Sequence, residues 1–314
     1  MHGVANIAQP VANRSQSKFT ASFGSLASLT RDPRHYQIAV LALLLIYGVG
    51  WLNFDVSVEQ ITILLGTVVL TQFIGARFPG QAAFDPRSPL ISGLSLCLLL
   101  RTNNPLLLVT AAVVAVASKF VIRWHGKHIF NPTNFAIVVT IALTGQAWVS
   151  PAQWGSKLYF AFLMACLGGI VIHSAMRSDV SYAFIAAYAA ILFGRAWWLG
   201  DPLAIPMKQF QSGALLLFTF FMISDPKTTP DSRAGRVIFA LLVASGAAFV
   251  QFGLYRTNGL LWSLATVSIL TPLIDRLLPG TKYQWRSLIP TVSKNGEIRE
   301  ENQLVRSPAA RLVG

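Results

Sequence analysis

Two short turns carry the side chains best suited to hold a ligand. In the first, Asn131 precedes Pro132, and in the second, Ser224 and Asp225 precede Pro226. Proline lacks a backbone N–H and biases the preceding residue away from helical geometry, so the carbonyls and the Asn131 amide are free to bind a ligand. Asp225 can hold a cation or accept a hydrogen bond from a ligand N–H. The two turns therefore predict a polar binding site.

A structural interpretation of both turns stays open. Asn131 suits the N-cap of a helix whose first residue is Pro132. Asp225 can cap a helix as well, or form a salt bridge with Arg233 or Arg236 at the edge of a membrane.

Lys119 lies inside an apolar stretch, where a charge is costly. It stands four residues before Arg123, about 6 Å deeper along a helix, so its ammonium can reach back to the membrane surface. If Lys119 faces the interior instead, it needs an anionic partner. Both orientations stay open.

The elements that position these residues are apolar stretches long enough, or nearly long enough, to cross a bilayer. Charged residues make up 12% of the chain and hydrophobic residues 54%. A soluble fold of this composition would expose too much apolar surface to water, so lipid is the expected solvent. The runs LALLL, LCLLL and AAVVAVA are continuously apolar, whereas barrel strands alternate. We predict an all-α integral membrane protein with about ten transmembrane helices. The predicted spans are 37–54, 58–76, 88–101, 105–123, 133–148, 157–175, 180–198, 207–223, 235–254 and 258–277.

The chain is expected to be duplicated, with halves at about 37–148 and 157–277. Five spans in each half force the two repeats into opposite orientations. Ser92-Gly93 and Ser212-Gly213 stand at the start of the third span of each half, and span 88–101 reaches only about 20 Å. Broken helices at matching positions of inverted halves predict a central site. The alternative to a central site is that these glycines only allow close packing of helices. For the short third span, 88–101, we expect a break in the helix.

The basic residues predict the orientation. Nineteen Lys and Arg fall on the side of the N-terminus and five on the opposite side, which places both termini in the cytoplasm. The net charge of +13 is then explained by contact with anionic lipid rather than nucleic acid. We expect a cytoplasmic segment at 1–36, a transmembrane domain at 37–279 and a cytoplasmic tail at 280–314. Cys97 and Cys166 lie in apolar spans with no metal-ligand spacing, so we expect no metal site.

Three segments together resemble a known family. They are HIFNPTN at 128–134, FFMISDPKT at 220–228 followed by GRVIF at 235–239, and TPLID at 271–275. In this order on a ten-span chain, they resemble the family of the D subunit of Rnf electron-transport complexes and the B subunit of Na⁺-translocating NADH:quinone reductase, from about Ser88 to Pro279. The resemblance implies an inverted five-plus-five helix fold, flavin redox centres, electron transfer coupled to Na⁺ or H⁺ movement, other membrane redox subunits as partners, and a place in the bacterial cytoplasmic (inner) membrane.

The chain departs from that family in one loop. Relatives carry a long loop between the fifth and sixth helices, with a threonine that bears flavin mononucleotide. Here the loop is only about Gly145–Ser156 and lacks the Ser/Thr-Gly-Ala-Thr pattern of the flavin acceptor. The most similar segment of this chain, residues 212–215, ends in Leu215, which has no hydroxyl. Covalent FMN is therefore not expected, and Thr228 and Thr229 stay open as alternative acceptors. We expect non-covalent FMN or riboflavin near Ser92, Gly93, Lys119, Asn131, Ser212, Gly213, Ser224 and Asp225.

Leu98, Phe218 and Phe221 are expected to form a hydrophobic constriction between the halves, which blocks ions until helices shift. Plain apolar packing is the alternative. We predict a flavin-dependent electron-transport subunit with no self-contained active site. The other hypothesis is a transporter or channel for small solutes or ions on the same inverted repeat, without redox chemistry.

Overall fold

The computed structural model describes residues 32–78, 84–150, 178–283, 291–292 and 298–299. The chain divides into two units, Pro33–Tyr283 and the two terminal segments Met1–Asp32 and Gln284–Gly314. Strands β5 (Thr291–Val292) and β6 (Ile298–Arg299) pair in the terminal unit. The predicted span 157–175 and most of both predicted cytoplasmic segments lie outside the described residues.

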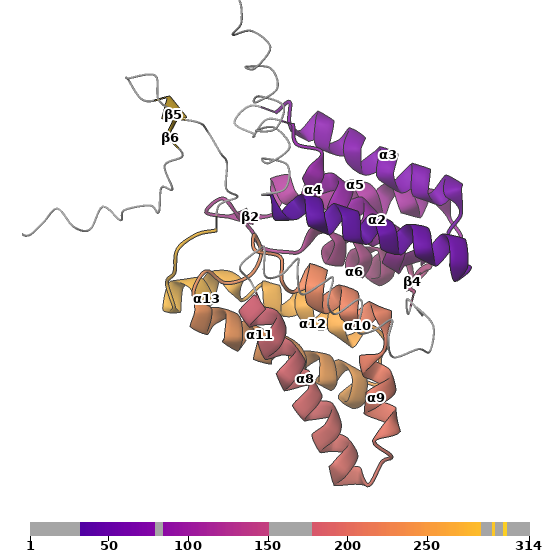
Figure 1. The fold of residues 1–314 in the computed structure, drawn as a ribbon, viewed down its shortest axis with the longest axis vertical. Helices are drawn as coiled ribbons and strands as arrows, with labels where there is room; N and C mark the ends of the chain where they lie inside the picture. The colour runs from indigo at the N-terminus through magenta and orange to yellow at the C-terminus, as the bar shows by residue number, and fades with distance from the viewer. Residues whose placement is uncertain (1–31, 79–83, 151–177, 284–290, 293–297, 300–314) are drawn as a thin grey trace, which may run out of the picture. The chain divides into compact units, whose positions relative to one another are not determined.

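The unit Pro33–Tyr283 is built from helices (Figure 1). Its first half contains α2 (Pro33–Trp51), α3 (Val58–Gly75), α4 (Arg87–Leu99), α5 (Pro105–Val121) and α6 (Pro132–Thr144). Its second half contains α8 (Ser178–Leu199), α9 (Ala204–Phe210), α10 (Gly213–Leu217), the π-helix η2 (Phe218–Met222), α11 (Arg233–Ala248), the π-helix η3 (Phe249–Gly253), α12 (Gly259–Ser268) and α13 (Thr271–Leu277). Two short antiparallel strand pairs connect segments between these helices. They are β1 (Leu100–Thr102) with β4 (Ala147–Val149), and β2 (Arg123–Trp124) with β3 (Lys127–His128).

The mostly helical, apolar class predicted from the sequence is confirmed. Among the described residues, α3, α8 and Arg233–Gly253 are long and apolar enough to cross a membrane, and α12 with α13, bent by 51°, would make a fourth span. Helices α4, α5, α6 and Gly213–Met222 are apolar but shorter. Ten crossings and the inverted orientation of the halves stay predictions.

Local sequence signals place several helix starts. Asn104 and Asn131 each cap a helix that begins with proline, and Ser232 caps α11. Gly145 ends α6 with a φ of 62°, a left-handed conformation that suits glycine. These signals are short-range, which is why they can be read from the sequence.

Corresponding helices of the two halves pack in the same order. In the first half α5 packs on α3 and α6, and in the second half α11 packs on α8 and α12. Helices α6 and α12 contact each other across the halves, where Asn134 Nδ2 donates a hydrogen bond to the Leu261 carbonyl at 3.1 Å. This order fits a duplicated chain.

The prediction of a break in the third span is wrong. Helix α4 runs unbroken through Ser92 and Gly93, and every residue from Ser92 to Leu99 is buried. A Cβ on Gly93 would lie 2.8 Å from Val68 Cγ2, so this glycine allows close packing on α3. The break falls in the eighth span, where α9 ends at Phe210 and α10 begins at Gly213.

A buried arginine ends α4. Arg101 Nη1 donates to the carbonyls of Cys97 and Leu100 at 2.8 Å, and Nη2 donates to the Leu98 carbonyl at 3.3 Å. Its guanidinium satisfies carbonyls that the helix end leaves without partners, and its charge favours that end of the helix dipole. A 13-residue helix can therefore end inside the protein.

Candidate functional site

Lys119 faces the helix bundle. It is 6% exposed, and its Nζ donates to Ser88 Oγ and Ser92 Oγ at 3.0 Å each and to the Ser88 carbonyl at 3.2 Å. The Ser92 carbonyl in turn accepts a hydrogen bond from Thr133 Oγ1 of α6 at 3.4 Å. Of the two orientations considered for Lys119, the structure has the one that faces the bundle. Among the described residues, Asp225 is the acidic side chain that acts on this charge.

Asn131 joins the two turns that the sequence singles out. Its Oδ1 accepts the backbone N–H of Asn134 at 3.1 Å, which confirms the predicted N-cap of α6. Its Nδ2 donates at 3.4 Å to both the Met222 carbonyl and Asp225 Oδ2, residues 91 and 94 positions away. One buried amide therefore serves both interpretations, since it caps a helix and holds the Asp225 turn beside it.

The Asp225 turn is closed by its own hydrogen bonds. Asp225 Oδ1 accepts the Lys227 N–H at 3.0 Å, and the Asp225 carbonyl accepts the N–H groups of Thr228 at 3.2 Å and Thr229 at 3.1 Å. Ser224 Oγ donates to the backbone of η2 at 2.6 Å. Burial lowers the pKa of Lys227, while Asp225 opposes that shift. The carboxylate is thus fixed at the end of η2 beside Asn131.

His128 lies in β3, just before the first turn. Burial, followed by the positive charges of Arg123, Lys119 and Lys227, lowers the pKa of His128 to about 4, and a hydrogen bond with the Lys119 backbone opposes the shift. Its Nδ1 is buried without a described partner. The imidazole is therefore neutral at physiological pH.

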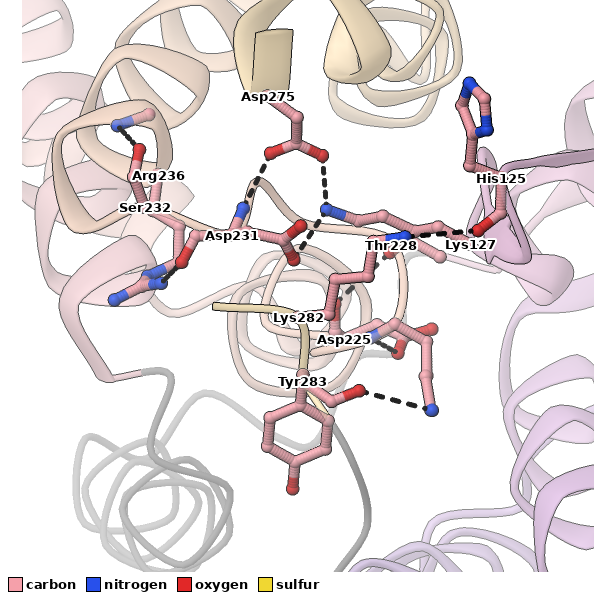
Figure 2. Close-up of polar contacts among 12 residues, drawn as sticks. His125, Lys127, Asp225, Thr228, Asp231, Ser232, Arg236, Asp275, Lys282 and Tyr283 are labelled. Atoms are coloured by element: carbon pink, nitrogen blue, oxygen red, sulfur yellow. Dashed lines mark hydrogen bonds and ion pairs between the residues drawn. The ribbon is translucent and has the colours of Figure 1, made fainter. Parts of the chain in front are cut away.

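A cation with two carboxylates joins residues next to or within the family-like segments (Figure 2): Lys127 directly precedes HIFNPTN, Asp231 lies between FFMISDPKT and GRVIF, and Asp275 ends TPLID. Lys127 Nζ lies 3.0 Å from Asp231 Oδ1 and 2.6 Å from Asp275 Oδ2, and the second Asp275 oxygen accepts the Asp231 N–H at 2.7 Å. These side chains are 14%, 7% and 17% exposed. The β2–β3 hairpin, the loop before α11 and the last helix are thereby held together.

Arg236 has a different partner from the one proposed. Its Nε and Nη2 bind the carboxylate of Asp179 at the start of α8, with Nε at 2.8 and 2.9 Å from the two oxygens, and its Nη1 donates to the Asp231 carbonyl at 2.8 Å. Of the two partners that the sequence offered for Asp225, Arg233 and Arg236, the second is therefore wrong. Arg236 joins α11 to α8.

The other predicted residues lie elsewhere. Ser212 and Gly213 stand at the start of α10, and the helical stretch Gly213–Met222 separates them from the Asp225 turn by roughly 15 Å. Gly93 packs on α3. The structure thus places Ser92, Lys119, Asn131, Ser224 and Asp225 in one region, and Ser212 and Gly213 at the other end of a helix.

The three residues of the predicted constriction are all buried. Leu98 is 0%, Phe218 1% and Phe221 4% exposed, and all three belong to the hydrophobic core. The Phe218 ring packs 5.2 Å from that of Phe184 on α8. Burial satisfies both the constriction and the packing interpretation, so the constriction stays a prediction.

Unpaired polar atoms remain near the joined turns. Asn134 Oδ1 and Thr229 Oγ1 are buried and have no hydrogen-bond partner among the described residues. A buried acceptor without a partner costs free energy, about 1–3 kcal/mol each. A flavin ring offers an N–H donor and two carbonyl acceptors, so this donor and acceptor set suits such a group.

Sequence reasoning assigned no role to Lys127, Asp231, Ser88 or Thr133. The first two belong to the ion cluster, and the last two complete the environment of Lys119. The chain has only 12 Asp and Glu against 25 Lys and Arg, so each acidic residue next to a membrane span was a usable signal. Ser88 and Thr133 had no comparable signal.

Comparison with known proteins supports the family resemblance. Residues 142–284 match the model of the NQR2, RnfD, RnfE family. The predicted resemblance is therefore confirmed for the second half, while HIFNPTN at 128–134 falls outside the matched range.

Relatives with similar sequences are described as the D subunit of an ion-translocating oxidoreductase complex. The protein of Citrobacter koseri is 31% identical over 155 residues, which are 48% of this chain and 41% of that protein. The protein of Escherichia coli O1:K1 is 31% identical over 138 residues, 42% of this chain and 36% of its own length. The protein of Salmonella paratyphi B is 32% identical over 139 residues, which are 43% of this chain and 36% of that protein. The chain thus spans about two fifths of the length of the curated relatives it matches.

Proposed function

From the similarity to the D subunit of ion-translocating oxidoreductase complexes, we propose that this chain is a membrane subunit of a flavin-dependent electron-transport system, with other membrane redox subunits as partners. The observation that carries the proposal is the junction of the two family-like turns, in which Asn131 donates to Asp225. A buried amide and a fixed carboxylate meet there, and the buried Lys119 ammonium, bonded to Ser88 and Ser92, interacts with that carboxylate through space. Such a set suits a polar, redox-active ring more than it suits plain packing.

In this proposal each side chain has a role in binding flavin. Asp225 and Asn134 Oδ1 accept from the ring N–H, and Asn131 holds Asp225 in place. The positive charge of Lys119 favours the negatively charged form of a reduced flavin. When bound, the flavin supplies the capacity to take up and release one or two electrons. FMN or riboflavin is held without a covalent bond, since Leu215 offers no hydroxyl and is 4% exposed.

Cation coupling is the second part of the proposal. The Asp225 turn is the direct continuation of η2, the π-helix that carries Phe218 and Phe221. π-Helical segments within α-helices are frequent at functional sites. A change of charge beside Asp225 then acts on the helix that holds the constriction, which is how electron transfer can control ion passage.

Flavin binding is tested by purifying the protein with its natural partners in mild detergent. The expected result is a flavin absorbance spectrum, release of all colour on denaturation and a polypeptide of unmodified mass. A mass increase equal to FMN would contradict non-covalent binding. A colourless protein would favour the transporter hypothesis.

Two matched variants test the residues. Asn131→Ser keeps an N-cap side chain but cannot span the distance to Asp225, whereas Asn104→Ser makes the same change at the cap of α5. We expect flavin content to fall at least severalfold in Asn131→Ser and to stay unchanged in Asn104→Ser. Equal flavin content in both would show that the Asn131 turn does not hold the cofactor.

A further inference from the structure

A pocket of about 640 Å³ lies between the β2–β3 hairpin and α13, on the open side of the ion cluster. Trp124, His125 and Lys127 line it from the hairpin, and Asp275, Arg276 and Lys282 line it from α13 and the segment that follows. Its volume is in the range of small-molecule sites, about 300–1,000 Å³. No role in the proposed flavin site uses this pocket.

The pocket carries surplus positive charge. Lys127 pairs with both Asp231 and Asp275, so this cluster itself carries one excess negative charge. Arg276 and Lys282 are exposed, and neither has a carboxylate partner among the described residues. Lys282 Nζ donates to the His125 carbonyl at 3.4 Å (Figure 2). The charged lining therefore holds the cations Lys127, Arg276 and Lys282 against the carboxylates Asp231 and Asp275, a net charge of +1, and the two exposed cations favour an anionic ligand.

The mouth of the pocket is apolar. Of its lining residues, Leu273 on α13 is 53% exposed and Trp124 is 56% exposed, and Leu277, one turn further along α13 and outside the lining, is 69% exposed. Helix α13 bends by 51° away from α12, the preceding part of a candidate span. Exposed leucines, a tryptophan and basic side chains at the end of a span are typical of the membrane–water interface. Thr271, 1% exposed, also lines the pocket, and its hydroxyl has no described partner.

We propose that this pocket binds the phosphate headgroup of an anionic phospholipid. Arg276 and Lys282 pair with the phosphate, Thr271 is an additional hydroxyl for the glycerol end, and the acyl chains lie along Leu273 and Leu277. The apolar mouth is what favours a lipid over a free phosphate or a soluble nucleotide, because those ligands leave the leucines exposed to water. Basic pockets beside helix ends are suited to such headgroups.

Native mass spectrometry of the purified, delipidated full chain tests the proposal. The probes are cardiolipin, zwitterionic phosphatidylcholine of equal chain length, inorganic phosphate and ATP. The variant R276Q/K282Q removes both charges, and R233Q, an exposed arginine at the start of α11 outside the pocket, is the matched control. We expect cardiolipin to bind in preference to phosphatidylcholine, and the double variant to weaken it about thirtyfold. R233Q should bind as the wild type does.

Three results would overturn the proposal. Equal cardiolipin affinity in wild type and R276Q/K282Q would show that the lipid binds elsewhere. Displacement of cardiolipin by ATP or inorganic phosphate at comparable concentration would identify the ligand as soluble. A loss of cardiolipin affinity in R233Q as large as that in R276Q/K282Q would show that the affinity depends on general surface charge and not on this pocket. The single variant L273Q keeps both cations, and it should weaken cardiolipin while leaving phosphate binding unchanged.

Discussion

His128 should make the stability of this protein depend on pH, and the His128→Gln substitution should remove that dependence. The folded-state pKa is lowered from 6.5 to about 4, first by burial and then by the charges of Arg123, Lys119 and Lys227. Between these two values, the unfolded chain binds a proton at this imidazole and the folded chain does not. The folded state therefore loses stability as the pH falls from 6.5 toward 4.

The size of the effect follows from the two pKa values. Proton linkage between pH 7 and pH 5 gives a loss of about 2 kcal/mol for pKa values of 6.5 and about 4. Such a loss lowers the melting temperature by roughly 4–8 °C in a chain of this size. Glutamine does not titrate in this range, so the variant lacks this contribution.

The measurement is thermal unfolding in mild detergent at pH 7 and pH 5. His125→Gln is the matched control, because His125 is an exposed histidine of the same hairpin. Wild type and His125→Gln should lose stability between the two pH values by about 2 kcal/mol more than His128→Gln does. An identical pH dependence in all three proteins would refute the argument that burial and the neighbouring cations keep His128 neutral.

The remaining predictions concern the ion cluster, the constriction and helix packing. Lys127→Met should destabilise the protein by about 3–5 kcal/mol, because it leaves two buried carboxylates facing each other, and adding Asp275→Asn should restore part of that loss in thermal unfolding. Replacing Phe218 and Phe221 with alanine should raise passive ion leak in reconstituted vesicles, and unchanged leak would favour plain packing. Gly246→Val should cost about 1–3 kcal/mol in the same unfolding assay, since a Cβ there would overlap Ser263 Oγ and would separate α11 from α12.

Local signals account for the part of the site that the sequence predicts. Proline after asparagine specifies a capped helix start, and Asn131 caps α6 as expected. The turn at Ser224 and Asp225 is likewise closed by bonds within a few residues. Both are readable because the interacting groups are neighbours in the chain.

The partners of the charged side chains could not be predicted in the same way. Lys127 pairs with carboxylates 104 and 148 residues away, and Arg236 pairs with Asp179 rather than Asp225. Several basic residues near span ends compete for few acidic ones, and spacing along the chain does not say which of them the packing brings together. The break in the eighth span rather than the third also depends on packing, because Gly93 serves the close approach of α4 to α3.

By itself, the sequence determined that this is a helical, apolar chain with the NQR2, RnfD, RnfE resemblance in its second half, because continuous apolar runs and short motifs act within one segment. Only the tertiary structure decided that Lys119 turns into the bundle toward Ser88 and Ser92, and that Asn131 reaches Asp225. The physical reason is that a side chain at the end of an apolar helix can be satisfied by the membrane surface or by a neighbouring helix. The packing of α4, α5, α6 and η2 supplies the second set of partners.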